Sequence, residues 1–355
     1  MKEALVSRDL TVNVVDSPIP SPGPDQVVVK VAVSGSNPKD WKRAVMSDKP
    51  MNTGDDIAGI VYTVGSNVVE FHPGDRVAAF HEMMAPHGSF AEYAVAEAYC
   101  TFHIPKKTSF EEASTIPLAA QTAAIGLYQN LSLPPPWHPT LTPTPLIVYG
   151  AASAVGSYTI QLALQSNIHP LICVAGRGIP HVESLIDKTK GDVVLDYRIG
   201  DAELVSQLKD IAQKHQGGIH YAFDAISEHN SYQNISAALT TDGSAHITLI
   251  LPGRDYSAIP SHVEHSITYV GVAHRGADGD AWQKKTGGAT KTGNQEFAYL
   301  LFRYFGRGLQ EGYFGGHPYE VVPGGLEGGV EKGLKDLKAG KASAVKYVFR
   351  IGDEK

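Results

Sequence analysis

The sequence has little cysteine: only Cys100 and Cys173 occur among its 355 residues. A secreted domain held by disulfides normally has more cysteines in paired spacing, so this count favours a reducing cytosol. Charged residues interrupt the first 17 positions, which therefore lack the apolar run of a signal peptide. No segment approaches the ~20 apolar residues that cross a bilayer. These absences predict a cytoplasmic protein without a membrane span.

Charge is also scarce, at 19% of the sequence, and the net charge is -7. The chain therefore has no excess of basic residues with which to bind nucleic acid or an acidic membrane. Because 43% of the 355 residues are hydrophobic, the chain can bury a large core and is expected to form two domains. The expected partners are small molecules or another protein.

The first hundred residues have the pattern of short strands separated by glycine and proline. Valine-rich stretches lie at residues 27–33 and 61–64, and Pro73-Gly74-Asp75 predicts a turn before a strand at 76–78. This spacing predicts a small barrel or sandwich. Thr108-Ser109 followed by two glutamates then indicates the start of a helix.

A proline-rich stretch at residues 133–145 can be neither helix nor central strand, and is either a surface connector or a loop that shapes the substrate entrance. Beyond it, apolar strands alternate with segments of helical length. Strands are expected at residues 146–149, 171–175, 193–195, 221–225, 246–250 and 267–272. This order predicts a doubly wound parallel sheet. The tail is expected to form helices at 297–305 and 326–337 and a strand at 346–351.

The first of these strands leads directly into a turn of small residues from Gly150 to Gly156, followed by a helix. Small residues let the backbone approach a pyrophosphate, and the helix N-terminus supplies free N–H groups. The match to G-x-G-x-x-G is imperfect, because Ala151 and Ser153 stand where the first two glycines would be. The alternative is a turn that serves packing alone.

The second strand is followed by Gly176-Arg177, where an NAD-binding protein would have an acidic residue for the ribose hydroxyls. Without that carboxylate, and with an arginine available for a 2′-phosphate, NADP(H) is favoured over NAD(H). Alternatively, Arg177 is an ordinary solvated loop residue.

Several motifs occur in an order that resembles the medium-chain dehydrogenase/reductase superfamily. They are Gly-Ser-Asn-Pro-Lys-Asp at 35–40, Gly-Asp-Asp-Ile-Ala-Gly at 54–59, Gly65, Gly-Asp-Arg-Val at 74–77 and Gly-Ser-Phe-Ala-Glu-Tyr at 88–93. The resemblance implies a GroES-like, β-rich catalytic domain at residues 1–125 and 275–355, with a Rossmann NADP(H)-binding domain at 126–274. The overall class is α/β, and the active site is expected in the cleft between the domains.

Zinc-dependent members of that superfamily hold their metal with cysteine, a His-Glu pair and a further cysteine. Here Asn37 occupies the first position, Asp55-Asp56 replaces the pair, and Ala119 or Ala120 lies near the third. A four-cysteine structural lobe is missing too. His81, Glu82 and His87 are interpreted as loop or core residues rather than substitute ligands, so no metal is expected.

The Asn-Pro-x-Asp motif at 37–40 resembles the quinone-oxidoreductase-like branch. Residues 37–42, 133–137 and 196–198 further resemble fungal trans-acting enoyl reductases. That resemblance implies NADPH-dependent reduction of activated C=C bonds in α,β-unsaturated polyketide thioesters, with a polyketide synthase as partner. Two alternatives stay open: a stand-alone NADPH reductase of quinones, enones or aldehydes, and a non-redox protein that retains the fold.

The resemblance also implies the roles of individual residues. Expected cofactor-binding residues are Lys39, Asp40, Trp41, Lys42, Ser153, Ala154, Val155, Gly156, Gly176, Arg177, Tyr197, Leu249, Ile250, Ser343 and Ala344. Expected substrate-binding residues are Thr122, Ala123, Tyr269, Val270, Gly271, Val272 and Ala273. Lys42 and Thr122 are the candidates for hydrogen-bond donor or proton relay toward the enolate. Lys42 could instead be a solvated surface charge, and Thr122 could bond a helix carbonyl.

Overall fold

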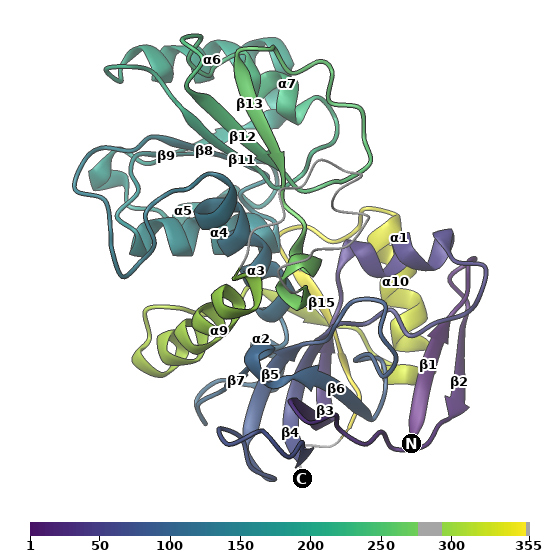
Figure 1. Ribbon diagram of the computed structural model, residues 1–355. Coiled ribbons are helices and arrows are strands. Elements are labelled where there is room, and N and C mark those ends of the chain that lie inside the picture. The colour runs from purple at the N-terminus through teal and green to yellow at the C-terminus, as the bar shows by residue number, and fades with distance from the viewer. Residues whose placement is uncertain (276–292, 353–355) are drawn as a thin grey trace. The chain divides into compact units, whose positions relative to one another are not determined.

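The computed structural model describes residues 1–275 and 293–352 of the chain (Figure 1). These residues form two compact units. The first comprises residues 1–121, 273–275 and 293–352, and the second comprises residues 122–272. No helix in the described ranges has both the length and the apolar character that crossing a membrane requires.

The first unit is built on a seven-stranded sheet in the order β14-β15-β3-β4-β5-β7, with β6 also paired to β3. Its strands are β3 (Gln26–Gly35), β4 (Asp56–Val64), β5 (Arg76–Phe80), β6 (Tyr93–Glu97), β7 (Thr101–His103), β14 (Tyr319–Val321) and β15 (Lys346–Arg350). β1 (Lys2–Val6) and β2 (Val12–Asp16) form a separate antiparallel pair. Alternate valines of β3 (Val27, Val29 and Val31) are buried in one core cluster, as a period of two requires.

The helices of this unit are α1 (Pro38–Met46), α2 (Phe110–Ala113), α9 (Asn294–Glu311) and α10 (Val330–Lys338). α2 starts where the sequence predicts, since the Ser109 side chain accepts the N–H of Glu112 at 3.0 Å. α3 (Pro117–Ala124) continues into a π-helical segment, η2 (Ile125–Asn130). The short helices η1 (Ala98–Cys100), η5 (Val270–His274) and η6 (Gly325–Gly329) complete the connections.

The second unit is a six-stranded parallel sheet in the order β10-β9-β8-β11-β12-β13. The strands are β8 (Leu146–Tyr149), β9 (Leu171–Ala175), β10 (Val193–Asp196), β11 (Tyr221–Asp224), β12 (Ala245–Leu249) and β13 (Val263–Ile267). They alternate with α4 (Ala154–Gln165), α5 (Ile179–Leu185), α6 (Asp201–Gln213) and α7 (Ser231–Ser236), and with η3 (Lys188–Lys190) and η4 (Tyr197–Ile199). The predicted α/β fold class is confirmed. The chain order reverses between β8 and β11, the place where such sheets bind ligands.

The prediction of a strand at residues 267–272 is wrong. The sixth strand is Val263–Ile267, and Val270–His274 forms a short helix instead. The apolar pattern misleads here because β13 is an edge strand, in which Glu264 and His265 are exposed. The apolar side chains of Val270 and Val272 are buried by the short helix that follows.

Candidate active site

The turn after β8 packs its backbone tightly against the start of α4. Gly150 has φ of +74°, and a Cβ on Gly156 would lie only 2.3 Å from the Gly150 carbonyl oxygen. The Ser153 side chain caps α4 by accepting the N–H of Gly156 at 3.0 Å. The remaining N–H groups of the first turn have no partner within the helix, so they are available to an anion.

This turn fits a dinucleotide pyrophosphate. Gly156 admits no side chain, which keeps the helix N-terminus close to the strand end, while Ala154 and Val155 are only half-buried. The turn also lies at the point where the sheet order reverses, because the N–H of Ala225, after β11, donates to the Tyr149 carbonyl at 3.0 Å. These are the features that the phosphate-binding turn of a doubly wound sheet requires.

The loop after β9 differs from an NAD site in having glycine, not a carboxylate, at position 176. A Cβ on Gly176 would lie 2.5 Å from the ring of Tyr197, which therefore covers the glycine backbone. The adjacent Arg177 is exposed, and no ion pair holds it within the described ranges. Arg198, in contrast, is neutralised by Asp196, with Nε–Oδ1 and Nη2–Oδ2 distances of 2.8 and 2.6 Å.

The strand ends beyond the turn carry further predicted residues. Leu249 is fully buried in the core of the second unit, whereas Ile250 is half-buried and donates its N–H to the Ser227 hydroxyl at 2.9 Å. Ser227 is in turn held by the buried Asp224, whose carboxylate accepts its N–H at 2.8 Å. Burial raises the pKa of Asp224 to about 6. Of the five predicted substrate residues from Tyr269 to Ala273, Ala273 is fully buried.

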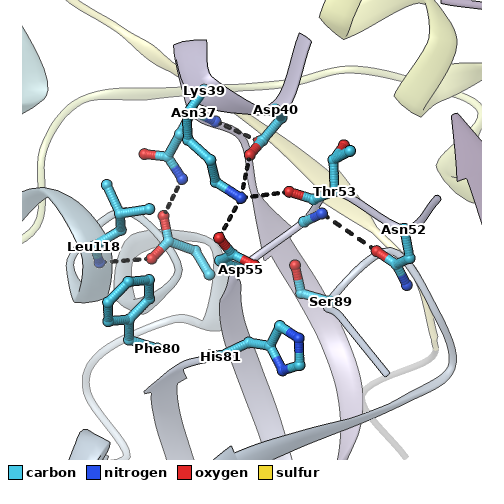
Figure 2. Close-up of polar contacts among 12 residues, drawn as sticks. Asn37, Lys39, Asp40, Asn52, Thr53, Asp55, Phe80, His81, Ser89 and Leu118 are labelled. Atoms are coloured by element: carbon cyan, nitrogen blue, oxygen red, sulfur yellow. Dashed lines mark hydrogen bonds and ion pairs between the residues drawn. The ribbon is translucent and has the colours of Figure 1, made fainter. Parts of the chain in front are cut away.

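In the first unit, the ammonium of Lys39 lies at the centre of a polar cluster between α1 and the loop before β4 (Figure 2). Its Nζ is 2.5 Å from the Thr53 carbonyl oxygen and 2.9 Å from Asp40 Oδ1, and it also forms an ion pair with Asp55. The Lys39 ammonium thus faces one backbone carbonyl and two carboxylates of the protein. Its expected contact with the cofactor stays a prediction.

A second buried network lies beside the first. Asp56 accepts Lys346 Nζ at 2.5 Å and Asn37 Nδ2 at 2.7 Å on one oxygen, and the N–H of Leu118 at 2.7 Å on the other. Lys346 also contacts the carbonyl of Thr115 at 3.2 Å. This network joins α1, α3, β4 and β15, and it balances one buried carboxylate with one buried ammonium.

The pKa values of Lys39, Asp40 and Asp55 reflect two opposing effects, burial and the attraction between their opposite charges. Burial raises the pKa of Asp40 to about 7 and that of Asp55 to about 6, although the Lys39 ammonium opposes both shifts. Burial lowers the pKa of Lys39, but the carboxylates of Asp40 and Asp55 outweigh it and the net shift is upward. Burial is the largest cause of both upward shifts, because it disfavours the charged form of a carboxyl group.

The predicted catalytic residues lie on separate helices. Lys42 is half-buried on α1, one turn beyond Lys39, with its ammonium 5.6 Å from the ring centre of Trp41. Thr122 is buried near the end of α3, and the neighbouring Ala123 is fully buried. Ser343 and Ala344 are half-buried before β15, and Ala344 has φ of +55°. The roles of these residues stay predictions.

The positions that hold zinc in metal-dependent members of the superfamily carry polar residues that bond to other side chains, or buried alanines. Asn37 and Asp56 bond each other and Lys346, Asp55 bonds Lys39, and Ala119 and Ala120 are buried apolar residues. Both ring nitrogens of His81 face backbone carbonyls, of Val95 and Ala85. Within the described ranges no group of three His, Cys, Asp or Glu side chains is placed to hold a metal.

Sequence reasoning missed two members of this region. Lys346 was expected only as the start of a strand, although a lysine in an otherwise apolar strand is a signal of a buried acidic partner. Thr53 gave no signal, because it accepts the Lys39 ammonium through its backbone carbonyl oxygen, a group that every residue has.

Residues 23–106 match the family model of the alcohol dehydrogenase GroES-like domain. Over 332 residues the chain is 49% identical to the trans-enoyl reductase fsr4 of Gibberella fujikuroi, covering 92% of each. It is 29% identical to lovC, the enoyl reductase component of the lovastatin nonaketide synthase of Aspergillus terreus, covering 94% of this chain and 92% of that one. The solved structure of CurK enoyl reductase superposes with a TM-score of 0.75 at 17% identity, covering 99% of each chain.

The GroES-like segment and the parallel sheet with its glycine-rich turn define a medium-chain dehydrogenase/reductase, a class of enzymes that uses nicotinamide cofactors. Within that superfamily, the chain belongs to the trans-enoyl reductase family. The family resemblance and the enoyl-reductase type of oxidoreductase that the sequence predicts are both confirmed.

Proposed function

We propose that this protein is an NADPH-dependent, metal-free enoyl reductase that acts in trans on α,β-unsaturated thioesters carried by a polyketide synthase. The observation that carries the proposal is 49% identity over 92% of the chain to a trans-enoyl reductase. The relative named as a component of the lovastatin nonaketide synthase supports a synthase as the partner. The first unit would be the catalytic domain and the second the cofactor domain.

NADPH is favoured over NADH by the loop after β9. Tyr197 covers Gly176 where an acidic residue would repel a 2′-phosphate, and Arg177 is exposed beside it. The turn from Ser153 to Gly156 would hold the pyrophosphate. When bound, the nicotinamide supplies the hydride that adds to the β-carbon of the substrate.

The chain itself has to stabilise the negative charge that develops on the thioester oxygen and provide a proton for the α-carbon. We assign hydrogen-bond donation toward the enolate to Lys42 and Thr122. The α1 segment from Lys39 to Lys42 is fixed at its first turn by the Lys39 contacts. A rigid α1 would keep the Lys42 side chain in one place during the reaction.

A substrate panel tests the proposal. NADPH absorbance is followed with an enoyl thioester on a carrier protein, the same acyl group on a small thiol, a quinone, an enone and an aldehyde. The proposal expects the enoyl thioester to be the preferred substrate, and the carrier-bound form to be the better of the two. Quinone turnover in its place would identify a stand-alone reductase, and binding of NADPH without oxidation would identify a non-redox protein.

The role of Lys42 is tested by Lys42→Ala. Loss of a positioned donor in the transition state is expected to lower turnover by roughly 10²-fold. NADPH binding, measured by calorimetry, should change little, because the phosphate turn is in the other unit. Wild-type turnover in this variant would show that Lys42 is only a surface charge.

A further inference from the structure

The cluster around Lys39 holds one negative charge too many for a buried site. Asp40 and Asp55 are 0% and 2% exposed, and both depend on the single ammonium of Lys39. The remaining buried carboxylate, Asp56, has Lys346 as its own partner at 2.5 Å. Leaving a buried carboxylate without a counter-charge costs several kcal/mol. A proton bound to Asp40 or Asp55 removes that cost.

The charged groups around this pair do not supply a second counter-ion. Arg43, on α1, lowers the pKa of Asp55 through its charge but forms no ion pair with it in the described structure. His81 contributes no positive charge near neutral pH, because burial lowers its pKa. Asp56 and Lys346 neutralise each other. Asp40 and Asp55 therefore titrate as one coupled pair.

A small cavity lies beside Asp55 and Lys39 and is also lined by one further polar group, Thr53. The cavity has a volume of about 10 Å³, which is room for about one water molecule. It is lined by Lys39, Arg43, Met51, Asn52, Thr53, Asp55, Met83 and Met84. Thr53 is only 5% exposed, and its hydroxyl has no hydrogen-bond partner within the described ranges. A water in the cavity would satisfy that hydroxyl and provide a path for a proton beside Asp55.

We propose that Asp40 and Asp55 share one acidic proton across Lys39, and that this proton passes through the Thr53 cavity to the α-carbon of the reduced substrate. The inference rests on the proposed enoyl reductase activity. Hydride addition forms a C–H bond at the β-carbon and leaves an enolate. The enolate electron pair forms the second C–H bond, at the α-carbon, while the carboxyl O–H bond breaks. A proton from solvent then restores the pair.

The shared proton is tested without substrate or cofactor. Aspartate carboxyl carbons of the full-length protein are followed by ¹³C NMR from about pH 5 to about pH 9, a range well above the ordinary aspartate pKa. The loss of one proton is expected in that range, and it should be seen at the carboxyl carbons of both Asp40 and Asp55. In Asp40→Asn or Asp55→Asn, the remaining carboxyl pairs one-to-one with Lys39 and should stay ionised throughout.

Asp224→Asn is the matched control, because Asp224 is a buried aspartate of raised pKa in the other unit. It should remove its own titration and leave the coupled pair unchanged. The shared proton is refuted if Asp40 and Asp55 of the wild type are both ionised across the whole range.

The use of the proton is tested with an enoyl thioester and NADPH. Both asparagine variants should turn over at least about tenfold more slowly, since general acids contribute at least that much. Asp55→Asn, which changes no expected cofactor-binding residue, should bind NADPH with wild-type affinity. The solvent deuterium isotope effect should rise, and the effect of deuterium at C4 of NADPH should shrink, because proton transfer becomes limiting. Unchanged turnover and isotope effects in both variants would overturn the role in catalysis.

The two proposals fail in different ways. If the wild type reduces no enoyl thioester, the proposed function is wrong and the use of the proton falls with it. The carboxyl titration still decides whether Asp40 and Asp55 share a proton. If the wild type reduces the thioester and the variants do so equally well, only the proton pathway is wrong.

Discussion

At the scale of single residues, the balance of buried positive and negative charges determines the surroundings of the predicted site residues. Lys39 lies in the motif that predicted cofactor contact, which stays a prediction, and its ammonium faces oxygens of Thr53, Asp40 and Asp55. The sequence shows the motif but not the charge count, because Asp55 and Lys346 reach the cluster only through the fold. Arg177 is exposed, which fits both interpretations of the sequence, contact with a 2′-phosphate and an ordinary solvated loop residue.

Arg177→Ala should weaken NADPH binding selectively. A charge-assisted hydrogen bond contributes about 1.5–3 kcal/mol, so the NADPH dissociation constant should rise roughly ten- to hundredfold while that of NADH changes little. Calorimetry with both cofactors measures this. Arg198→Ala is the matched control, because that arginine is already paired with Asp196. An equal loss for NADPH and NADH would mean that Arg177 does not contact the 2′-phosphate.

Asp40 should also make stability depend on pH in an unusual direction. Burial raises its pKa from 3.8 to about 7 in the folded protein. Between these values the folded state binds a proton that the unfolded chain releases, so stability should fall as pH rises and level off above about 7. In Asp40→Asn this fall should be smaller, which thermal unfolding across pH would show. Parallel melting curves for the two proteins would contradict the raised pKa.

At the scale of elements, the strands of the second unit could be predicted from the sequence more accurately than the elements of the first. Five of the six expected parallel strands match β8 to β12 within a residue or two, because buried parallel strands are continuous apolar runs. The sixth failed because β13 is an exposed edge. The residues at the start of α1 are recognisable as a motif in the sequence, but the helix itself was not predicted. Pro38 can begin this helix because Asn37 and Asp40 cap it.

Gly156→Ala tests the element that holds the pyrophosphate. The new Cβ would lie 2.3 Å from the Gly150 carbonyl oxygen and 2.8 Å from the Cα of Ala151, which are backbone atoms. Overpacking of this kind costs about 1–3 kcal/mol of stability, and the displaced helix should weaken NADPH binding by roughly tenfold or more. Denaturant unfolding and calorimetry measure the two effects.

Gly315→Ala provides the control for the same substitution in open space, because its nearest neighbour would be 4.0 Å away. That variant should keep wild-type stability and cofactor affinity. Wild-type NADPH affinity in Gly156→Ala would show that the turn does not position the phosphates.

At the scale of the whole molecule, the features that the proposed reaction requires lie in two compact units. The second unit has the dinucleotide fold, with its turn and strand ends at the reversal of the sheet order. The first unit has the charged cluster and the predicted donor Lys42. The family could be predicted from motifs in register along the chain, whereas the Asp40–Lys39–Asp55 cluster needed the fold, because its members come from segments that meet only in space.

The most direct test of the central claim follows the label from NADPH that carries deuterium at both C4 positions into the product. A carrier-bound enoyl thioester is incubated with the wild-type protein, and the product is analysed by mass spectrometry and NMR. We predict a saturated thioester with one deuterium at the β-carbon and a solvent proton at the α-carbon. An unreduced thioester, or a saturated one without deuterium at the β-carbon, would contradict it.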